Sequence, residues 1–170
     1  EFDKLIIATG VDTNYFGNVE LEQNVIPMKS VSEALYLRNI ILEDYEAALI
    51  ETDHEKRQHL LDIVIVGGGP TGVEVAGALA EMKKYVLPKD YKELNEEQID
   101  IYLLQGGDRI LDGMSASSSA KAELYLQNLG VKVCKGSYVS TFDGKTVTMK
   151  NGTTYSAKKV IWAAGIAGKK

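Results

Sequence analysis

The chain has 170 residues, a length typical of one compact domain. Apolar residues make up 45% of it and charged residues 25%, which excludes an intrinsically disordered chain. Acidic residues outnumber basic ones by 24 to 19, and the net charge of −5 argues against nucleic acid as a partner. No apolar run approaches the roughly 20 residues that a membrane-spanning helix needs, so we expect no membrane contact by this chain. Its one cysteine, Cys134, cannot form an internal disulfide, which fits a reducing compartment.

The first third of the chain predicts a short strand and a long helix. The apolar run Lys4–Thr9 indicates a short buried strand. Ser30, with Glu33 three residues later, forms a capping box, which predicts the start of a helix. The apolar positions of this helix recur at spacings of three and four and comprise Ala34, Leu37, Ile41, Tyr45 and Ala48. We interpret the polar stretch Glu51–His59 as a solvated continuation of this helix or as its closing turn.

The middle of the chain alternates strands and helices. Leu61–Val66 is a continuous β-branched apolar run, which is typical of a parallel strand covered on both faces. A helix is predicted from about Thr71 to Val86, ended by Pro88. The elements that follow are the strand Ile99–Leu104, the helix Ser115–Leu129 and the strand Val131–Cys134.

The chain then changes character, because three short β runs are separated by turn dipeptides. Asp143-Gly144 and Asn151-Gly152 both favour tight hairpin turns. The runs that they separate are Ser137–Phe142, Lys145–Lys150 and Thr153–Ser156, and a last apolar strand follows at Lys159–Ala163. The sequence therefore predicts an α/β fold: a Rossmann-like parallel sheet with helices on both faces and an inserted three-stranded antiparallel β-meander.

One motif carries chemistry, the run Gly67-Gly68-Gly69-Pro70-Thr71-Gly72 between a buried strand and a helix. In a dinucleotide-binding turn, Gly67 allows the tight turn, Gly69 lets the backbone approach a pyrophosphate, and Gly72 lets the helix pack on the strand. Pro70 gives up an N–H group that a first helical turn leaves unpaired in any case. The start of the helix would then hold the phosphates. A glycine-rich turn without a ligand is the alternative.

The other half of this fingerprint is an acidic residue at the end of the next strand, where it holds the adenosine ribose. This chain has Gln105 there, a neutral amide that can bind a ribose hydroxyl but does not repel the 2′-phosphate of NADP. We interpret Arg109 as a structural residue of the following loop, with contact to a 2′-phosphate as the alternative. Glu74, in the first turn of the phosphate-binding helix, is either a helix-start residue stabilised by the dipole or part of the site. We interpret His54 and His59 as solvated side chains and expect no metal site.

The sequence around the glycine motif resembles the type II NADH dehydrogenases, the single-subunit NADH:quinone oxidoreductases. The resemblance is carried by the run from Gly67 to Gly77, by Lys29-Ser30 and Ala34–Asn39, by Arg109-Ile110-Leu111, and by the strand Val160–Gly165. It implies that Gly67, Gly69 and Gly72 hold the pyrophosphate of NADH. It also implies that Glu74 lies near the contact between nicotinamide and flavin, and that Ala164 and Gly165 line the nicotinamide end. The family usually has Glu where this chain has Gln105.

The resemblance also implies a division of the chain, because the family inserts its NADH-binding domain between two halves of an FAD-binding domain. Residues 1–29 would be the end of a flavin-domain half and a linker, residues 30–158 the NAD(H)-binding domain, and residues 159–170 the return strand toward the flavin domain. The chain would thus be an excised fragment, inactive alone, whose parent transfers hydride from NADH to FAD and then reduces a quinone. We expect NADH as the ligand of this chain, with FAD and quinone as partners of the parent only. The parent would lie on the cytoplasmic side, peripheral to the inner or cytoplasmic membrane.

Two other functions remain open from the sequence. One is another NAD(P)H-dependent flavoprotein reductase, such as an oxidase or a ferredoxin reductase; the absence of a pair of nearby cysteines disfavours a disulfide reductase. The other is a non-catalytic NAD(H)-sensing domain. The sequence leaves open the choice between NADH and NADPH, the electron acceptor and the oligomeric state.

Overall fold

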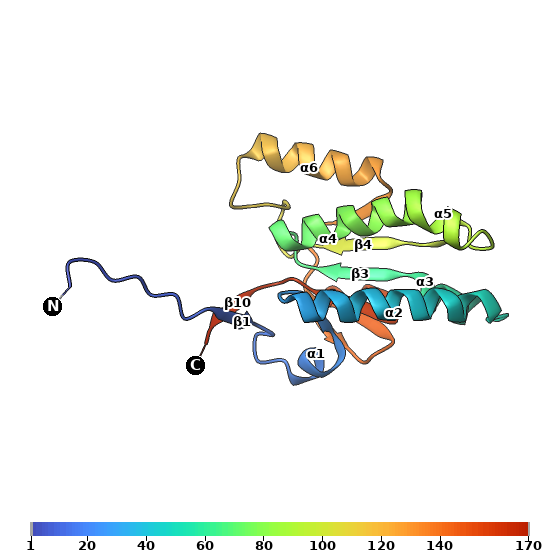
Figure 1. Ribbon diagram of the computed structural model, residues 1–170, viewed down its shortest axis with the longest axis horizontal. Coiled ribbons are helices and arrows are strands. Elements are labelled where there is room, and N and C mark those ends of the chain that lie inside the picture. The colour runs from blue at the N-terminus through green and yellow to red at the C-terminus, as the bar shows by residue number, and fades with distance from the viewer. Residues whose placement is uncertain (1, 170) are drawn as a thin grey trace.

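A parallel β-sheet forms the centre of the computed structural model, which describes residues 2–169 (Figure 1). Five strands lie in the spatial order β2-β9-β3-β4-β5, and every neighbouring pair is parallel. Their bounds are Ile26–Pro27 (β2), Ile63–Val66 (β3), Ile101–Leu104 (β4), Val131–Cys134 (β5) and Lys159–Trp162 (β9). The predicted parallel sheet is therefore confirmed, with the short β2 added at one edge.

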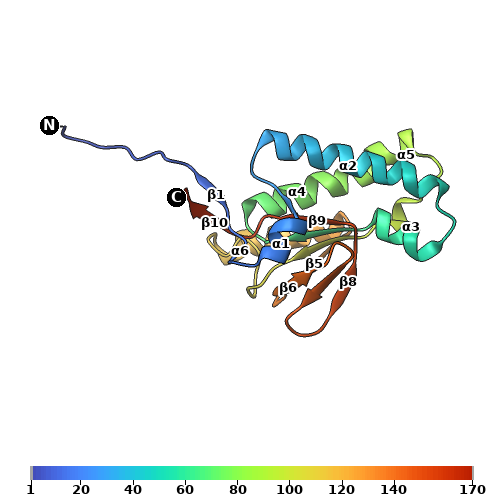
Figure 2. The same cartoon turned by 90° about the horizontal axis from the view of Figure 1, so that it is seen from below.

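Helices α2 and α4 lie on one face of this sheet (Figure 2), and α6 packs into the same apolar cluster through Leu126. The helices are Val19–Asn24 (α1), Val31–Ile50 (α2), His54–Leu61 (α3), Pro70–Glu81 (α4), Leu87–Asp90 (α5) and Ala116–Asn128 (α6), with a π-helical turn at Met82–Val86 and a 3-10 turn at Glu96–Gln98. None of the helices in residues 2–169 combines the length and the apolar character that crossing a membrane requires.

The opposite face of the sheet carries the predicted meander and the short helix α1 (Figure 2). The meander consists of Val139–Phe142 (β6), Thr146–Met149 (β7) and Thr154–Ser156 (β8), paired antiparallel in that order. It contributes the buried side chains Phe142, Val147 and Met149 to this side of the core. The fold class predicted from the sequence, including the inserted meander, is confirmed.

Alternation along the strands explains why the sheet has an apolar layer on each face. Ile63 and Ile65 of β3 belong to the cluster under the helices, whereas Val64 and Val66 belong to the cluster under the meander. Because both faces are covered, the strand must be apolar at every position, which is the pattern that the sequence shows.

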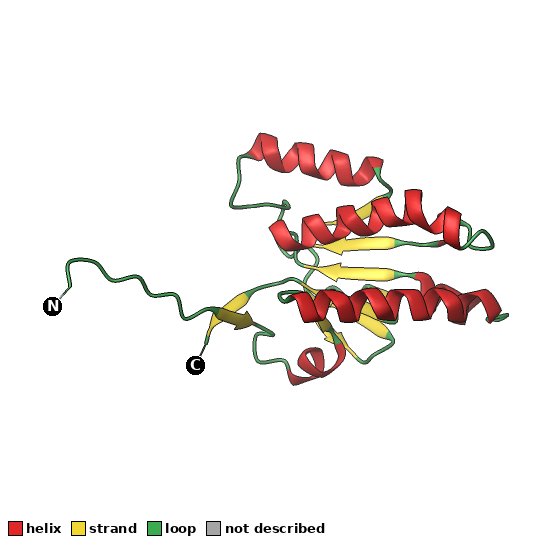
Figure 3. Ribbon diagram, viewed as in Figure 1, coloured by secondary structure: helices red, strands yellow, loops and turns green. Residues whose placement is uncertain are grey.

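A separate two-stranded sheet joins the two ends of the described chain. Val11–Thr13 (β1) pairs antiparallel with Ile166–Gly168 (β10) beside the carboxyl ends of the central strands (Figure 1). The strand predicted at Lys4–Thr9 is wrong: these residues have no regular structure (Figure 3), and Ile6 is 89% exposed. Its β-branched pattern favours a strand, but a strand needs a partner, and none pairs with it within residues 2–169.

The capping box at the start of α2 is confirmed, since Glu33 donates its N–H to Ser30 Oγ while its own carboxylate accepts from the Ser30 N–H. Two other helix boundaries differ from the prediction. The polar stretch after α2 belongs largely to a separate helix, α3, because Asp53 caps a new helix start. Pro88 does not end the helix before it, because it lies in the first turn of α5, where no N–H donor is needed.

A buried ion pair ties α2 to the central sheet. Asp44 of α2 and Lys159 of β9 are 1% and 0% exposed, and Lys159 Nζ lies 2.9 Å from Asp44 Oδ2. Lys159 also donates to the Leu60 carbonyl, and Lys158 binds the other oxygen of Asp44 at 2.6 Å. Burial lowers the pKa of Lys159, while the Asp44 carboxylate opposes this shift. The pair fixes where α2 lies relative to β9.

Candidate functional site

The candidate site lies at the carboxyl edge of the central sheet, where the loops after β3, β4 and β9 meet. In Figure 1 the arrowheads of β3 and β4 point toward the start of α4. The loops are tied together by backbone hydrogen bonds from Gly67 N–H to the Leu104 carbonyl and from Ala163 N–H to the Val66 carbonyl. Ligands of open α/β sheets bind at this edge.

The predicted glycine loop is packed too closely for side chains at three of its positions. A Cβ at Gly67 would lie 2.7 Å from the Ala163 carbonyl, and Gly67 has a φ of +110° that favours glycine. A Cβ at Gly72 would lie 1.8 Å from the Gly67 carbonyl oxygen. A Cβ at Gly68 would lie 2.8 Å from the Ile110 side chain. These glycines are explained by packing of strand, loop and helix.

Gly69 differs, because nothing lies within 4 Å of a Cβ built there. It is the N-cap of α4 and has no side chain with which to cap the helix, and Pro70 follows in the first turn. The N–H groups of a first helical turn have no partner within the helix. An open, uncapped helix start beside an empty space suits an anionic group, and packing alone does not explain a glycine there.

Gln105 holds the glycine loop rather than standing free. Its Oε1 accepts a hydrogen bond from the Gly68 N–H at 2.8 Å. Its Nε2 lies close to Gly107, 3.1 Å from a Cβ built on that residue. The amide nitrogen therefore remains a donor at the mouth of the site, and no carboxylate stands at this position.

A pocket of about 560 Å³ extends from Gln105 toward the meander, and we call it the Gln105 pocket. Its lining residues include Gly67, Gln105, Gly106, Tyr138, Lys150 and Ala164. Tyr15, Phe16 and Trp162 form an aromatic wall, with ring centroids of Tyr15 and Phe16 6.1 and 6.4 Å from that of Trp162.

A second pocket, of about 420 Å³, lies on the other side of the β9 end, and we call it the Glu74 pocket. Thr71, Glu74, Lys29, Trp162 and Gly165 are among its lining residues. Trp162 thus borders both pockets, and its indole N–H donates to the Asn14 carbonyl at 3.0 Å. The exposed Glu74 lines this pocket from α4. The sequence had placed Glu74 in the first turn of α4, but it lies just past that turn, which contains no acidic residue.

The structure therefore brings the predicted site residues to one edge of the sheet. Gly67, Gln105 and Ala164 line the Gln105 pocket, Thr71, Glu74 and Gly165 line the Glu74 pocket, and Gly68, Gly69 and Pro70 connect the two. Arg109 is not among the lining residues, and its Nη2 donates to the Asp112 carbonyl of its own loop at 2.5 Å. This contact supports the structural interpretation of Arg109.

Sequence reasoning missed Tyr15, Phe16, Tyr138 and Lys150. Tyr15 and Phe16 precede α1 in a turn-rich segment whose sequence has no helical or strand periodicity. Tyr138 and Lys150 lie on either side of the first hairpin of the meander, and only the register of β6 and β7 brings them together.

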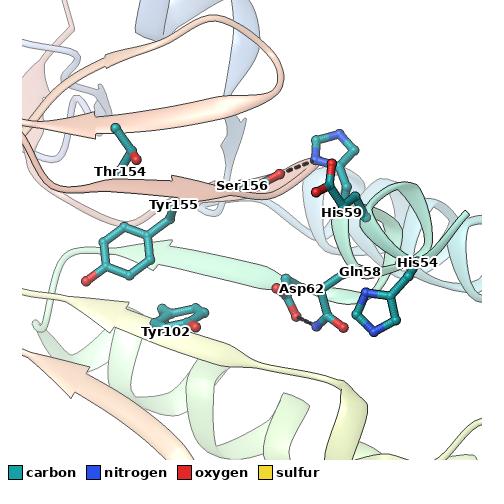
Figure 4. A pocket seen from close by; sticks show the side chains of 9 residues that line it. His54, Gln58, His59, Asp62, Tyr102, Thr154, Tyr155 and Ser156 are labelled. Atoms are coloured by element: carbon teal, nitrogen blue, oxygen red, sulfur yellow. Dashed lines mark hydrogen bonds between the residues drawn. The ribbon is translucent and has the colours of Figure 1, made fainter.

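A third pocket, of about 360 Å³, lies at the opposite edge of the sheet and shares no lining residue with the other two (Figure 4). His59 reaches Ser156 there, with 3.2 Å between Nδ1 and Oγ, and Asp62 accepts from Gln58 Nε2 at 2.6 Å (Figure 4). Burial raises the pKa of Asp62 to about 6 and lowers that of His59. Within residues 2–169, no group of three or more potential ligands could hold a metal ion.

Comparison with known proteins identifies relatives along the whole chain. The sequence profile of the pyridine nucleotide-disulphide oxidoreductase family matches residues 1–170. The chain is 35% identical, over 98% of its length, to the type II NADH:quinone oxidoreductase Ndh of Mycobacterium tuberculosis, and it covers 37% of that protein. It is 31% identical to an external alternative NAD(P)H-ubiquinone oxidoreductase of Arabidopsis thaliana mitochondria, over 98% of this chain and 29% of the relative.

A solved structure shows the same arrangement of elements. NDH2 from Plasmodium falciparum, solved in complex with NADH, superposes with a TM-score of 0.87 at 26% identity, over 94% of this chain and 34% of that one. The chain spans about a third of the length of the curated relatives described above.

Proposed function

Because this chain belongs to the pyridine nucleotide-disulphide oxidoreductase family and is homologous to type II NADH:quinone oxidoreductases, we propose that it is an NAD(H)-binding domain. The prediction of that family from the sequence is confirmed. The chain would bind NADH across the carboxyl edge of the central sheet, with its pyrophosphate on the start of α4. The parent protein would use the bound NADH to reduce a quinone.

The observation that carries this proposal is the contrast between Gly69 and its neighbouring glycines. Gly67 and Gly72 are required by close contact with backbone atoms and Gly68 lies against the Ile110 side chain, whereas nothing lies within 4 Å of a Cβ built at Gly69. A residue without a side chain at an open helix start is needed when something outside the chain approaches the backbone. A pyrophosphate has the charge that the positive end of a helix dipole attracts.

Two pockets then receive the two halves of the dinucleotide. We assign the adenosine half to the Gln105 pocket, because Gln105 lies at the end of β4, where the ribose of a dinucleotide is held. The nicotinamide half would extend to the Glu74 pocket along Ala164 and Gly165. Glu74 would border the nicotinamide there, and the indole of Trp162 would separate the two halves.

FAD, held by the parent outside the residues of this chain, would supply the hydride acceptor. This chain has one glycine fingerprint, at Gly67–Gly72, and the proposal uses it for NADH. The chain's own part is to hold NADH, to orient the nicotinamide, and to keep Glu74 beside it. We also carry forward the proposed division at residues 1–29, 30–158 and 159–170, with the parent peripheral to a membrane.

Isothermal calorimetry on the purified chain tests this proposal. NADH should bind at one site per chain with saturable heat, and FAD should give no saturable binding. The chain should also purify without the visible absorption of a flavin. Saturable binding of FAD with none of NADH would contradict the assignment of the glycine loop to NADH.

A further inference from the structure

Lys150 is the one charged side chain among the residues that line the Gln105 pocket. The lining set contains no aspartate or glutamate, although the chain as a whole carries a net charge of −5. Asp108, the carboxylate that follows Gly107 in the chain, is exposed and outside this set. A single cation in a pocket without carboxylates suits an anionic group on the ligand.

The position of Lys150 is set by the backbone and by the ring of Tyr138. The Lys150 N–H donates to the Tyr138 carbonyl at 2.8 Å, which holds the two residues side by side across the hairpin. Lys150 Nζ lies 5.5 Å from the centroid of the Tyr138 ring, within the range of a cation–π contact. This contact holds the ammonium group near the ring, and both residues line the pocket.

Tyr138 in turn connects Lys150 to the loop after β4. A Cβ at Gly106 would lie 2.7 Å from the Tyr138 ring, so the ring packs directly on the residue that follows Gln105. Tyr138 is nevertheless 56% exposed, and the exposed part of its ring offers an apolar surface to a planar base. One side of the pocket is thus formed by four residues in contact, Gln105, Gly106, Tyr138 and Lys150.

Gln105 leaves the charge of Lys150 unopposed. Its Oε1 is already bound to the Gly68 N–H, and its exposed group is an amide, which donates hydrogen bonds. A glutamate at this position would repel a phosphate by its charge. With Gln105 present, the amide and the ammonium group both favour a phosphate near the ribose.

We propose that Lys150 makes the Gln105 pocket accept NADPH as well as NADH, by pairing with the 2′-phosphate that distinguishes the two. This inference rests on the proposed function, because it takes the Gln105 pocket as the adenosine half of the site. Lys150 would thus determine cofactor specificity from the meander, a part of the fold separate from Gln105 at the end of β4 and from the loop that holds Arg109. The hairpin between β6 and β7 is therefore part of the nucleotide site.

The test compares Lys150→Met with the matched control Lys145→Met in the purified chain. Both lysines are exposed and lie at opposite ends of β7, so each variant removes one positive charge from the meander. Dissociation constants for NADH and for NADPH are measured by calorimetry at low and at moderate salt. Thermal unfolding of each variant confirms that the meander is intact.

Lys150→Met should weaken NADPH binding by about tenfold, which corresponds to ~1.4 kcal/mol, and should change NADH binding by less than about twofold. Lys145→Met should leave the ratio of the two affinities unchanged. In the unmutated chain, added salt should weaken NADPH binding more than NADH binding, because salt screens the attraction between Lys150 and the 2′-phosphate.

Three results would overturn the inference while leaving NADH binding, and with it the proposed function, in place. These are an unchanged affinity ratio in Lys150→Met, an equal loss for both dinucleotides, and an unmutated chain that binds NADH but not NADPH. If the unmutated chain binds neither dinucleotide, the proposed function itself fails.

Discussion

Two glycines of the same loop, Gly72 and Gly69, should respond differently when each is replaced by alanine: the first change should lower stability and the second should lower NADH affinity. In Gly72→Ala the new methyl group would lie 1.8 Å from the Gly67 carbonyl oxygen. The oxygen is a backbone atom and the methyl carbon is bonded directly to the backbone of α4, so strand β3, the loop and α4 must move apart to restore an ordinary contact. Overpacking of this kind costs up to about 3 kcal/mol of unfolding free energy. For a domain of this size that is a fall in melting temperature of roughly 6–12 °C.

In Gly69→Ala the methyl group meets nothing within 4 Å, and the φ of −73° is one that alanine adopts. The unfolding free energy should therefore change by no more than about 0.5 kcal/mol. The methyl group would nevertheless occupy the space through which a pyrophosphate reaches the helix start. We expect NADH affinity to fall by at least about tenfold, equivalent to one lost phosphate contact of ~1.4 kcal/mol.

The assay measures urea unfolding and NADH calorimetry on both variants and on the control Gly77→Ala. A Cβ at Gly77 would have its nearest neighbour at 3.8 Å, in the interior of α4, so this variant should gain about 0.5–1 kcal/mol and bind NADH normally. A Gly69→Ala chain that binds NADH as tightly as the unmutated one would refute the phosphate assignment. A Gly72→Ala chain of unchanged stability would refute the close packing of the loop.

Three further substitutions test the two buried carboxylates and the position of Gln105. Asp62→Asn should raise the unfolding free energy at pH 7 by about 1 kcal/mol and leave it unchanged below pH 4. Because the pKa of Asp62 in the folded chain is about 6, the unmutated chain loses stability as the pH rises from about 4 to 6. Two pKa units represent ~3 kcal/mol, and solvent in the open pocket reduces this value. Urea unfolding at several pH values measures this, and parallel pH curves for the two proteins would contradict it. Asp44→Ala should cost about 3 kcal/mol in chemical unfolding, because it leaves the Lys159 ammonium group buried and without its carboxylate; a loss below about 1 kcal/mol would show that the pair is not needed. Gln105→Glu keeps an acceptor for the Gly68 N–H but adds a negative charge beside the ribose. Calorimetry should therefore show NADPH binding weakened by about tenfold and NADH binding little changed. An unaltered ratio of the two affinities would place Gln105 away from the ribose.

The parts of the fold that local sequence determines were predictable. The glycine motif, the capping box at Ser30 and the Asp-Gly and Asn-Gly turns each act over a few residues, and all of them stand where the sequence indicated. The start of α3 was also available, since Asp53 is a typical N-cap residue, but the polar stretch around it obscured a helix that shows almost no amphipathic pattern.

The parts that depend on distant partners were not predictable. Residues 4–9 have the composition of a strand, but composition does not say whether a pairing edge is present. The aromatic wall of the Gln105 pocket joins Tyr15 and Phe16 to Trp162, nearly 150 residues away in the chain. Tyr138 and Lys150 required both the hairpin register and the packing of the ring on Gly106. Such pairings follow from tertiary structure, which a single sequence does not display.

The central claim is that NADH binds along the carboxyl edge of the sheet, and amide chemical shifts measured during an NADH titration of the isotope-labelled chain test it most directly. We expect saturable shifts at the amides of Gly68, Gly69, Thr71 and Gly72, of Gln105–Gly107 and of Ala163–Gly165, with the largest at Gly69. The amides around His59 and Ser156, at the opposite edge, should not move. Shifts concentrated at that opposite edge, or none anywhere at millimolar NADH, would contradict the claim.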